Sequence, residues 1–261
     1  MILDTLAGAC RVRVAQRKAA MGMDAIAEKA FALPKGEGGK LEKALGKEGL
    51  SFLCEVKKAS PSKGIIAQNF PYVSIAEEYE AAGADAISVL TEEDFFLGSP
   101  RYLEEISSAV SVPTLRKDFV VDPYMIYEAK VLGASAVLLI CAILTDQQLQ
   151  SYVSLAEQLG LSALVEVHDE CEMDMAANAG AKLIGVNNRD LRTFHVDPSY
   201  SLRLRDKAPK DAIFVAESGI TGPQDIPNLV DHGVDAVLIG EAMMRADQKE
   251  LFLQSLREAA R

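Results

Sequence analysis

The fold is decided by a short unit that recurs along the chain and is clearest at residues 133–140, Gly133-Ala134-Ser135-Ala136 followed by Val-Leu-Leu-Ile. The glycine suits the end of a helix, where the backbone needs a left-handed conformation that a Cβ disfavours. The apolar run after it is typical of a buried strand. Similar units begin at Gly83-Ala84-Asp85-Ala86, Gly180-Ala181-Lys182-Leu183 and Gly233-Val234-Asp235-Ala236. Each unit therefore marks a point at which a helix ends and a strand begins.

Outward from this unit, eight short apolar runs alternate with longer segments of helical periodicity. The expected strands occupy residues 52–57, 86–90, 114–117, 136–140, 163–167, 183–187, 213–217 and 236–239. The expected helices occupy residues 74–82, 100–110, 123–132, 146–159, 170–179, 198–207, 223–232 and 248–260. Eight βα units of about 25 residues predict an α/β fold, a closed (β/α)8 TIM barrel, because parallel strands need covering helices and right-handed crossovers. The alternative is a doubly wound open sheet, but no G-x-G-x-x-G motif follows the first strand.

Residues 1–50 lie outside this rhythm, so we expect an N-terminal helical extension and loop there and a barrel domain over residues 51–261. Residues 2–33 are rich in Ala, Arg and Lys and indicate a helix. Residues 34–49 contain five glycines and alternating charges, which predict an exposed loop or a short, weak helix. Two roles are equally open for the extension: an end cap over the bottom of the barrel, or a mobile lid over its mouth.

Composition and charge narrow the classes of partner. The chain has 261 residues and a formal charge of −11, with 49% apolar and 25% charged residues, which excludes disordered and fibrous proteins. The negative charge repels nucleic-acid phosphates and anionic membrane surfaces, so we expect neither as a partner. The longest apolar run, residues 136–144, is far shorter than the roughly 18 residues of a transmembrane helix.

The cysteines and histidines show no metal or disulfide pattern. The four cysteines include no C-x-x-C pair and lie mostly in apolar runs, which predicts buried, reduced thiols and a cytoplasmic protein. His168, His195 and His232 lack the spacing of zinc motifs, and we expect surface or helix-capping roles for them. We therefore expect neither a metal nor a cofactor.

Polar and ionisable residues stand at the ends of several expected strands, where apolar residues are the rule. Such a group costs several kcal/mol in a strand covered on both faces, unless it is paired or reaches the open mouth. Side chains two positions apart on a strand lie on the same face, so we expect these polar residues to face inward like the apolar residues two positions before them. The carboxyl ends of parallel barrel strands all lie at one rim, so these residues should meet there. A buried ion-pair network that only stabilises the barrel is the alternative to a site for acid–base chemistry. The residues are Glu55, Lys57, Lys117, Glu166, Asn187 and Glu217.

Glycine-containing turns after the last two strands predict a phosphate site. Residues 217–220, Glu-Ser-Gly-Ile, and residues 239–241, Ile-Gly-Glu, leave backbone N–H groups open to an anion in the loops where barrels often bind phosphate. Ser60 is a further hydroxyl donor from the first loop. Phe96 and Phe119, near the rim ends of two strands, are either core residues or walls for an aromatic ligand.

Five motifs then arrive in the order found in indole-3-glycerol phosphate synthases, and the chain resembles that family over essentially its whole length. They are EVKKASPSKG at 55–64, LRKDF at 115–119, LVEVH at 164–168, GVNNRDL at 185–191 and VAESGI at 215–220. The resemblance implies a carbon–carbon lyase of tryptophan biosynthesis. Its substrate would be 1-(2-carboxyphenylamino)-1-deoxyribulose 5-phosphate, which closes to an indole ring with loss of carbon dioxide and water.

The resemblance also implies roles for individual residues. Lys117 would be the general acid, Lys57 would hold the substrate carboxylate, and Glu166 would be the base in dehydration. Glu55 and Asn187 would position the lysines and sugar hydroxyls, and Glu217 would contact the substrate. The expected phosphate and substrate contacts are Ser60, Ser218, Gly219, Gly240, Glu241 through its backbone N–H, Arg189, Phe96 and Phe119. Arg189 could instead pair locally with Asp190 or brace a carboxylate at the rim.

Two other functions stay open on the residues alone. One is a sister barrel similar to phosphoribosylanthranilate isomerase, although that reaction needs one acid and one base rather than two lysines and three glutamates. The other is a catalytically silent barrel that binds a phosphosugar. The expected partner in each case is a small phosphorylated molecule. We expect a monomer, and weak association with other enzymes of tryptophan biosynthesis stays open.

Overall fold

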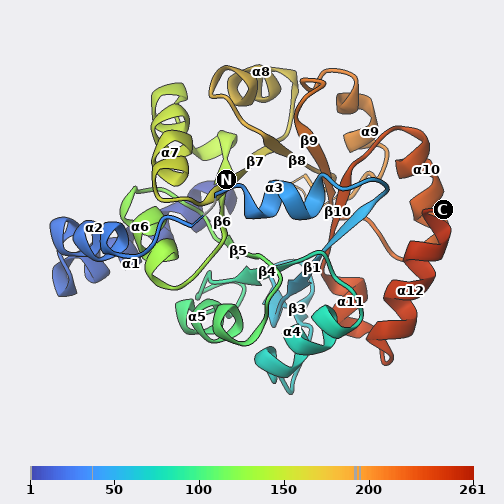
Figure 1. Ribbon diagram of the computed structural model, residues 1–261, viewed down its shortest axis with the longest axis horizontal. Helices are drawn as coiled ribbons and strands as arrows, with labels where there is room; N and C mark the ends of the chain where they lie inside the picture. Colours follow the sequence, from blue (N-terminus) through green and yellow to red (C-terminus); the bar gives the residue numbers. More distant parts are fainter. Residues whose placement is uncertain (1, 37, 191–192, 194) are drawn as a thin grey trace.

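The structure, a computed structural model, describes residues 2–36, 38–190, 193 and 195–261. Within these residues eight parallel strands close into a barrel in the order β1-β10-β9-β8-β7-β6-β5-β4, so the predicted (β/α)8 barrel is confirmed (Figure 1). Leu191, which ends one of the quoted motifs, lies outside the described residues. The strands are β1 Ser51–Val56, β4 Ala86–Leu90, β5 Thr114–Lys117, β6 Ala136–Ile140, β7 Ser162–Val167, β8 Leu183–Asn187, β9 Ile213–Glu217 and β10 Ala236–Ile239.

Helices follow the strands and cover the outside of the barrel (Figure 1). Local signals set where several of them begin: Ser99 accepts a hydrogen bond from the Arg101 N–H, and Thr145 forms a capping box with Gln148. The helices of the barrel are α4 Tyr72–Ala81, α5 Pro100–Ala109, α6 Tyr124–Val131, α7 Asp146–Gln158, α8 Glu170–Asn178, α9 Tyr200–Arg205, α10 Ile226–Asp231, α11 Glu241–Arg245 and α12 Lys249–Ala259, with 3-10 turns at Cys141–Ile143 and Pro223–Asp225.

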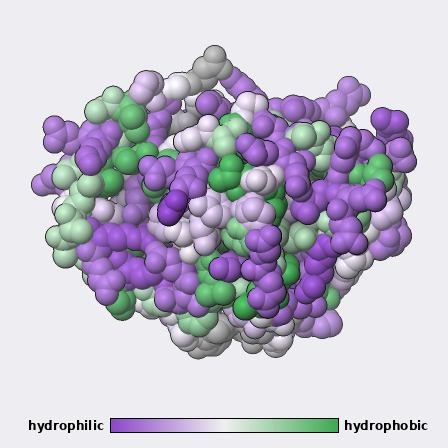
Figure 2. Space-filling view, turned by 90° about the horizontal axis from the view of Figure 1, so that it is seen from below, coloured by the Kyte–Doolittle hydropathy of each residue, from purple (hydrophilic) through white to green (hydrophobic). Residues whose placement is uncertain are grey.

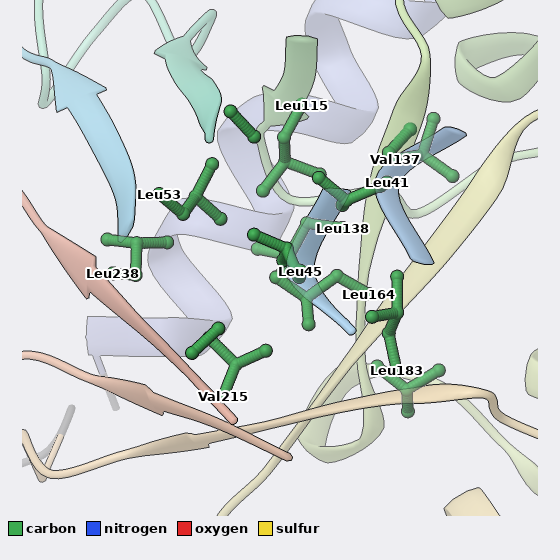
Figure 3. Packing of buried hydrophobic residues seen from close by; sticks show 14 of the residues in the cluster. Leu41, Leu45, Leu53, Leu115, Val137, Leu138, Leu164, Leu183, Val215 and Leu238 are labelled. Atoms are coloured by element: carbon green, nitrogen blue, oxygen red, sulfur yellow. The ribbon is translucent and has the colours of Figure 1, made fainter. Parts of the chain in front are cut away.

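The inward faces of the strands form an apolar layer directly below the charged rim. Figure 3 shows Leu53, Leu115, Leu164 and Val215 among the packed residues of the core. Each precedes one of the rim residues Glu55, Lys117, Glu166 and Glu217 by two positions, so the pleat carries both side chains on the same face. The barrel core and the charged rim are therefore successive layers of the same strands.

One charged strand residue lies on the other face. Arg116 on β5 is completely buried between the barrel and α6, where its guanidinium lies 2.7 Å from the carboxylate of Glu128 and 3.4 Å from that of Asp118. Its Nη1 also donates to the Met125 carbonyl at 2.9 Å. The sequence analysis did not predict this buried ion pair.

The extension consists of α1 Ile2–Ala20, α2 Met23–Ala32 and α3 Lys40–Leu45. The expected single helix over residues 2–33 is wrong, since Gly22 at the start of α2 has an extended ψ of 161° that interrupts it. Of the two alternatives for residues 34–49, the structure shows the short helix, and residues 34–36 and 46–49 on either side of it are exposed. Helix α3 crosses one end of the barrel (Figure 1), and its Leu41 and Leu45 are fully buried among the inward leucines (Figure 3).

Helix α1 lies instead at the side of the mouth. Its Arg13 and Arg17 pair with carboxylates of the loop after β4: Arg13 lies 2.8 Å from Glu92, and Arg17 contacts Glu93. Leu6 lines the cavity at the carboxyl ends of the strands. The extension therefore seals the bottom through α3 and contributes to the mouth through α1.

The face shown in Figure 2 is mostly hydrophilic, with apolar residues in small groups. Among the described residues, no helix combines the length and the apolar character needed to span a bilayer.

We expect Leu45→Ala to lower the free energy of unfolding by about 2–5 kcal/mol, because it leaves a cavity in the sealed end of the barrel. Urea unfolding measures the change, and Leu251→Ala is a matched control since Leu251 is 58% exposed on α12. Equal, small effects of the two substitutions would contradict the role of α3 as a structural seal.

Candidate active site

A cavity of about 940 Å³ lies at the carboxyl ends of the strands. The residues predicted for the site all line its wall, although they come from positions spread over most of the barrel. Their location in one cavity is thus a structural fact, whereas their chemical roles stay predictions. The residues are Glu55, Lys57, Ser60, Phe96, Lys117, Phe119, Glu166, Asn187, Arg189, Glu217, Ser218, Gly219, Gly240 and Glu241.

Lys117 is the centre of the charged rim. Its Nζ donates to Oε2 of Glu166 at 2.9 Å and to Oε2 of Glu217 at 2.8 Å. Burial alone would lower the pKa of Lys117, but Glu166, Glu217 and Glu55 outweigh it and raise that pKa above its usual range. The side chain is 13% exposed, so this ammonium group is charged, partly dehydrated and open to the cavity.

Glu217 accepts a hydrogen bond from the same lysine as Glu166, but only one of its two carboxylate oxygens has a hydrogen-bond partner among the described residues. Its side chain is 1% exposed, and Oε1 has no hydrogen-bond partner among the described residues. Burial and the charge of Glu166 raise the pKa of Glu217 to about 7, although Lys117 acts in the opposite direction. The carboxylate fits because Gly185 lies beside it; a Cβ at Gly185 would collide with Oε1. A carboxyl group with this pKa can exchange protons near neutral pH.

Glu166 differs from Glu217 in that its pKa is lowered rather than raised. Burial alone would raise its pKa, but Lys117 and His168 lower that pKa below the usual range. Its Oε1 accepts a hydrogen bond from Nδ2 of Asn187 at 3.3 Å. Two carboxyl groups of the same type thus differ in protonation behaviour because their partners differ, as acid and base chemistry requires.

The expectation of a surface or capping role for His168 is wrong. Its side chain is 20% exposed, and its ring lies between two carboxylates: Nε2 is 3.3 Å from Oε1 of Glu166, and Nδ1 is 3.1 Å from Oε2 of Glu172. Burial alone would lower the pKa of His168, but these carboxylates raise it to about 10. A sequence signal existed, since His168 follows Glu166 by two positions and so continues the same strand face.

Glu55 and Lys57 form a second ion pair at the rim. They pack directly on Gly240, where a Cβ would meet Glu55 and would lie 2.6 Å from Nζ of Lys57. Gly240 was predicted as a phosphate contact through its backbone, and the structure adds a steric reason for glycine at this position.

The turn after β9 has an unusual backbone. Ser218 and Gly219 both have positive φ, 67° and 88°, although such a conformation is disfavoured for serine. Asn188, which the sequence analysis missed, holds the turn: its Nδ2 donates to the Ser218 carbonyl at 3.0 Å, and its Oδ1 accepts from the Ser201 N–H. Consecutive left-handed residues of this kind can form an anion-binding concavity from backbone N–H groups.

The acidic side chain of Glu241 is neutralised by two cations that sequence reasoning also missed. Its Oε1 lies 3.0 Å from Nε of Arg245 and 3.7 Å from Nζ of Lys63. Lys63 and Arg245 both line the cavity on this side. Arg189 spans two loops, with Nη1 3.5 Å from Oγ of Ser62. This end of the cavity therefore combines three cations with the two turns predicted to bind phosphate.

Phe96 and Phe119 form an apolar wall, with ring centroids 6.2 Å apart. The loop carrying Phe96 is fixed by Glu92, whose Oε2 accepts hydrogen bonds from the N–H groups of Phe95 at 2.7 Å and of Phe96 at 3.0 Å. Phe252 and Leu6 add further apolar surface. A flat aromatic ligand would find contacts of the right kind here.

Cys10, Cys54 and Cys141 are buried free thiols, whereas Cys171 is exposed. Within the described residues, no group of three or more His, Cys, Asp and Glu side chains is arranged to hold a metal ion.

We expect Glu217→Gln to stabilise the folded protein at pH 8 by about 1–3 kcal/mol, because it removes a buried, poorly compensated negative charge. The pKa of this group is raised from 4.5 to about 7 in the folded protein, so the cost is absent below about pH 4.5 and complete above about pH 7. Urea unfolding at pH 5 and pH 8 measures it. Glu258→Gln, on the exposed face of α12, is the control; a loss of stability at pH 8, or an equal gain at both pH values, would contradict the assignment.

Comparison with solved structures supports the fold alone. The chain superposes on 3-hexulose-6-phosphate synthase from Salmonella typhimurium with a TM-score of 0.67 and 17% identity, over 81% of this chain and 98% of the other. It superposes on thiamine phosphate pyrophosphorylase from Pyrococcus furiosus with a TM-score of 0.62 and 17% identity, over 81% and 95%.

Relatives found by sequence share a much higher identity with this chain than these structures do. Indole-3-glycerol phosphate synthase of Ruminiclostridium cellulolyticum is 51% identical over 260 residues, covering 100% of both chains. The enzymes of the same name from Lacticaseibacillus paracasei, 49% identical over 100% of both chains, and Endomicrobium trichonymphae, 50% identical over 99% of this chain and 100% of the other, are similar. The family model described as indole-3-glycerol phosphate synthase matches residues 3–256. The chain therefore belongs to the indole-3-glycerol phosphate synthase family.

Proposed function

We propose that this chain converts 1-(2-carboxyphenylamino)-1-deoxyribulose 5-phosphate into indole-3-glycerol phosphate, with loss of carbon dioxide and water. The observation that carries the proposal is the ammonium group of Lys117, which is held between Glu166 and Glu217 inside a cavity large enough for such a substrate. Membership of the family supports the same reaction. We also propose residues 51–261 as the catalytic barrel, with residues 1–50 as its extension.

Ring closure needs an acid at the ketone oxygen. The ring carbon that bears the carboxylate attacks the ketone carbon, and Lys117 donates a proton to the oxygen as its charge develops. Lys57 holds the substrate carboxylate, and Glu55 orients Lys57 through their ion pair. The carboxyl group then leaves as carbon dioxide, and its bonding electrons restore the aromatic ring.

Dehydration completes the second ring. The new hydroxyl group leaves as water with a proton from an ammonium group, for which Lys57 is the candidate donor. Glu166 removes a proton from the neighbouring carbon, and the electron pair forms the ring double bond. Its lowered pKa keeps Glu166 in the carboxylate form that a base requires. Asn187 holds Glu166 and contacts the sugar hydroxyls, and Glu217 contacts the substrate beside Lys117.

The substrate spans the two ends of the cavity. Its phosphate binds to the turns at Ser218, Gly219 and Gly240 and to the hydroxyl of Ser60, with Lys63 and Arg245 supplying positive charge. Glu241 contributes its backbone N–H, and Arg189 closes the rim. The anthranilate ring packs against Phe96 and Phe119. The cytoplasmic location, the monomeric state and the association with other enzymes of tryptophan biosynthesis stay predictions.

We expect Lys117→Ala to fold but to lose more than about 10²-fold in kcat, as removal of a general acid does. Because the chain contains no Trp, the fluorescence of the indole product can be followed with little protein background. Failure of the purified wild-type protein to produce this signal from the aminoribulose phosphate would refute the proposed reaction. A near-normal kcat in Lys117→Ala would remove Lys117 from its role.

Gly240→Ala should lower kcat/KM by about tenfold or more, since the added Cβ displaces the Glu55–Lys57 pair. Gly8→Ala is the matched control, because a Cβ there meets no atom within 4 Å. Circular dichroism establishes that both variants fold. Equal activity of the two variants would show that the position of the ion pair does not matter.

A further inference from the structure

The imidazole ring of His168 lies beside Glu166, the proposed base, on the side away from the cavity. His168 follows β7, and its Nε2 lies 3.3 Å from Oε1 of Glu166, whereas Nδ1 lies 3.1 Å from Oε2 of Glu172 on α8. Glu172 also accepts the backbone N–H of His168 at 2.8 Å, and the hydroxyl of Tyr200 donates to the His168 carbonyl. The backbone and the ring are therefore both fixed, with Nε2 within ion-pair distance of Glu166 but without a hydrogen-bond partner among the described residues.

The surroundings favour the charged form of this ring. The groups that face it are carboxylates: Glu166 from its own strand and Glu172 from α8, with Asp169 next in sequence. Among the described residues, Tyr200 from α9 donates to the His168 carbonyl, and the thiol of Cys141, in the 3-10 turn after β6, donates to the Glu172 carbonyl. A positive ring between two negative groups is stable even when it is largely removed from water. The pKa of His168, raised to about 10, agrees with this geometry.

Two cations, Lys117 and His168, lie beside Glu166, and they approach it from different sides. Lys117 contacts Oε2 of Glu166 from the cavity side and lines the cavity wall. The described part of that wall includes Glu166 but not His168, so His168 contacts the carboxylate from behind. If Lys117 donates its proton during ring closure, it becomes neutral and no longer stabilises the charge of Glu166. Glu217 and Glu55, the other carboxylates near the rim, then raise the proton affinity of Glu166 further.

We propose that His168 is a positioning residue whose charged ring keeps Glu166 in the carboxylate form throughout turnover, including the interval in which Lys117 is neutral. This inference rests on the proposed function, in which Glu166 is the base of the dehydration step. His168 itself contacts no substrate and transfers no proton. Its effect therefore falls on kcat and on the pH dependence of kcat rather than on KM.

The direct test is the pH profile of kcat for wild type and for His168→Asn, which removes the charge but retains an amide donor. Loss of a cation 3.3 Å from Glu166 raises the proton affinity of that carboxylate. The acid limb of kcat should therefore move to higher pH by about 1–3 units, with KM changed by less than about threefold. His232→Asn is the matched control, because His232 is exposed and its ring contacts only the Asn228 carbonyl among the described interactions; its profile should match wild type.

A second measurement does not depend on activity, and its first part needs only the wild-type protein. The chain has three histidines, so their ring signals can be resolved by NMR and followed during a pH titration of the wild-type protein. We expect one ring to stay charged above pH 8, and the spectrum of Glu172→Gln, which removes one of its partners, to show that same ring titrating at lower pH. No signal that stays charged above pH 8, or a kcat profile of His168→Asn that overlays wild type, would overturn the inference.

These outcomes are distinguishable from failure of the proposed function. If wild type makes no indole product, the reaction is refuted whatever the NMR titration shows. If wild type turns over and His168→Asn retains the wild-type acid limb, only the role of His168 is refuted.

Discussion

One ammonium group between two buried carboxylates organises the mouth of this barrel. Taking Glu166 and Glu217 out of water is costly, and Lys117 offsets part of that cost for both. Because Lys117 lies at nearly the same distance from both carboxylates, 2.9 Å and 2.8 Å, their other partners decide their protonation states. Glu166 has Asn187 and His168 as partners and stays ionised, whereas Glu217 has a raised pKa and one oxygen without a hydrogen-bond partner among the described residues. The asymmetry arises from neighbours of the pair, not from the pair itself.

The N-terminal extension supports this site from two directions. Helix α3 completes the apolar layer beneath the rim through Leu41 and Leu45. Helix α1 acts at the mouth, where Arg13 pairs with Glu92 and Glu92 holds the loop of Phe96. A segment outside the barrel repeat therefore contacts both the sealed end of the barrel and the loop that carries the aromatic wall. Both interactions join residues far apart in sequence, which is why sequence analysis left the position of the extension open.

The fold was predictable because its signals are local. Glycine-terminated helices and apolar strands repeat, and a parallel strand with a charged carboxyl end indicates where the rim lies. The errors occurred where a side chain interacts with a residue of another secondary-structure element. His168 was expected at the surface, but its ring lies between Glu166 and Glu172, and Glu172 belongs to the following helix, α8. The break at Gly22 was missed because glycine in a helix is only mildly unfavourable.

The amino-acid sequence by itself determined the barrel, the side of it that carries the chemistry and the residues that gather there, because side-chain alternation and strand direction are properties of the chain. Only the tertiary structure decided how those residues share charge. Proton affinity depends on distances of about 3 Å between side chains from different strands and on the water they lose, and such distances exist only after the barrel has closed. The same holds for Gly185 and Gly240, whose missing side chains make room for carboxylates from neighbouring strands.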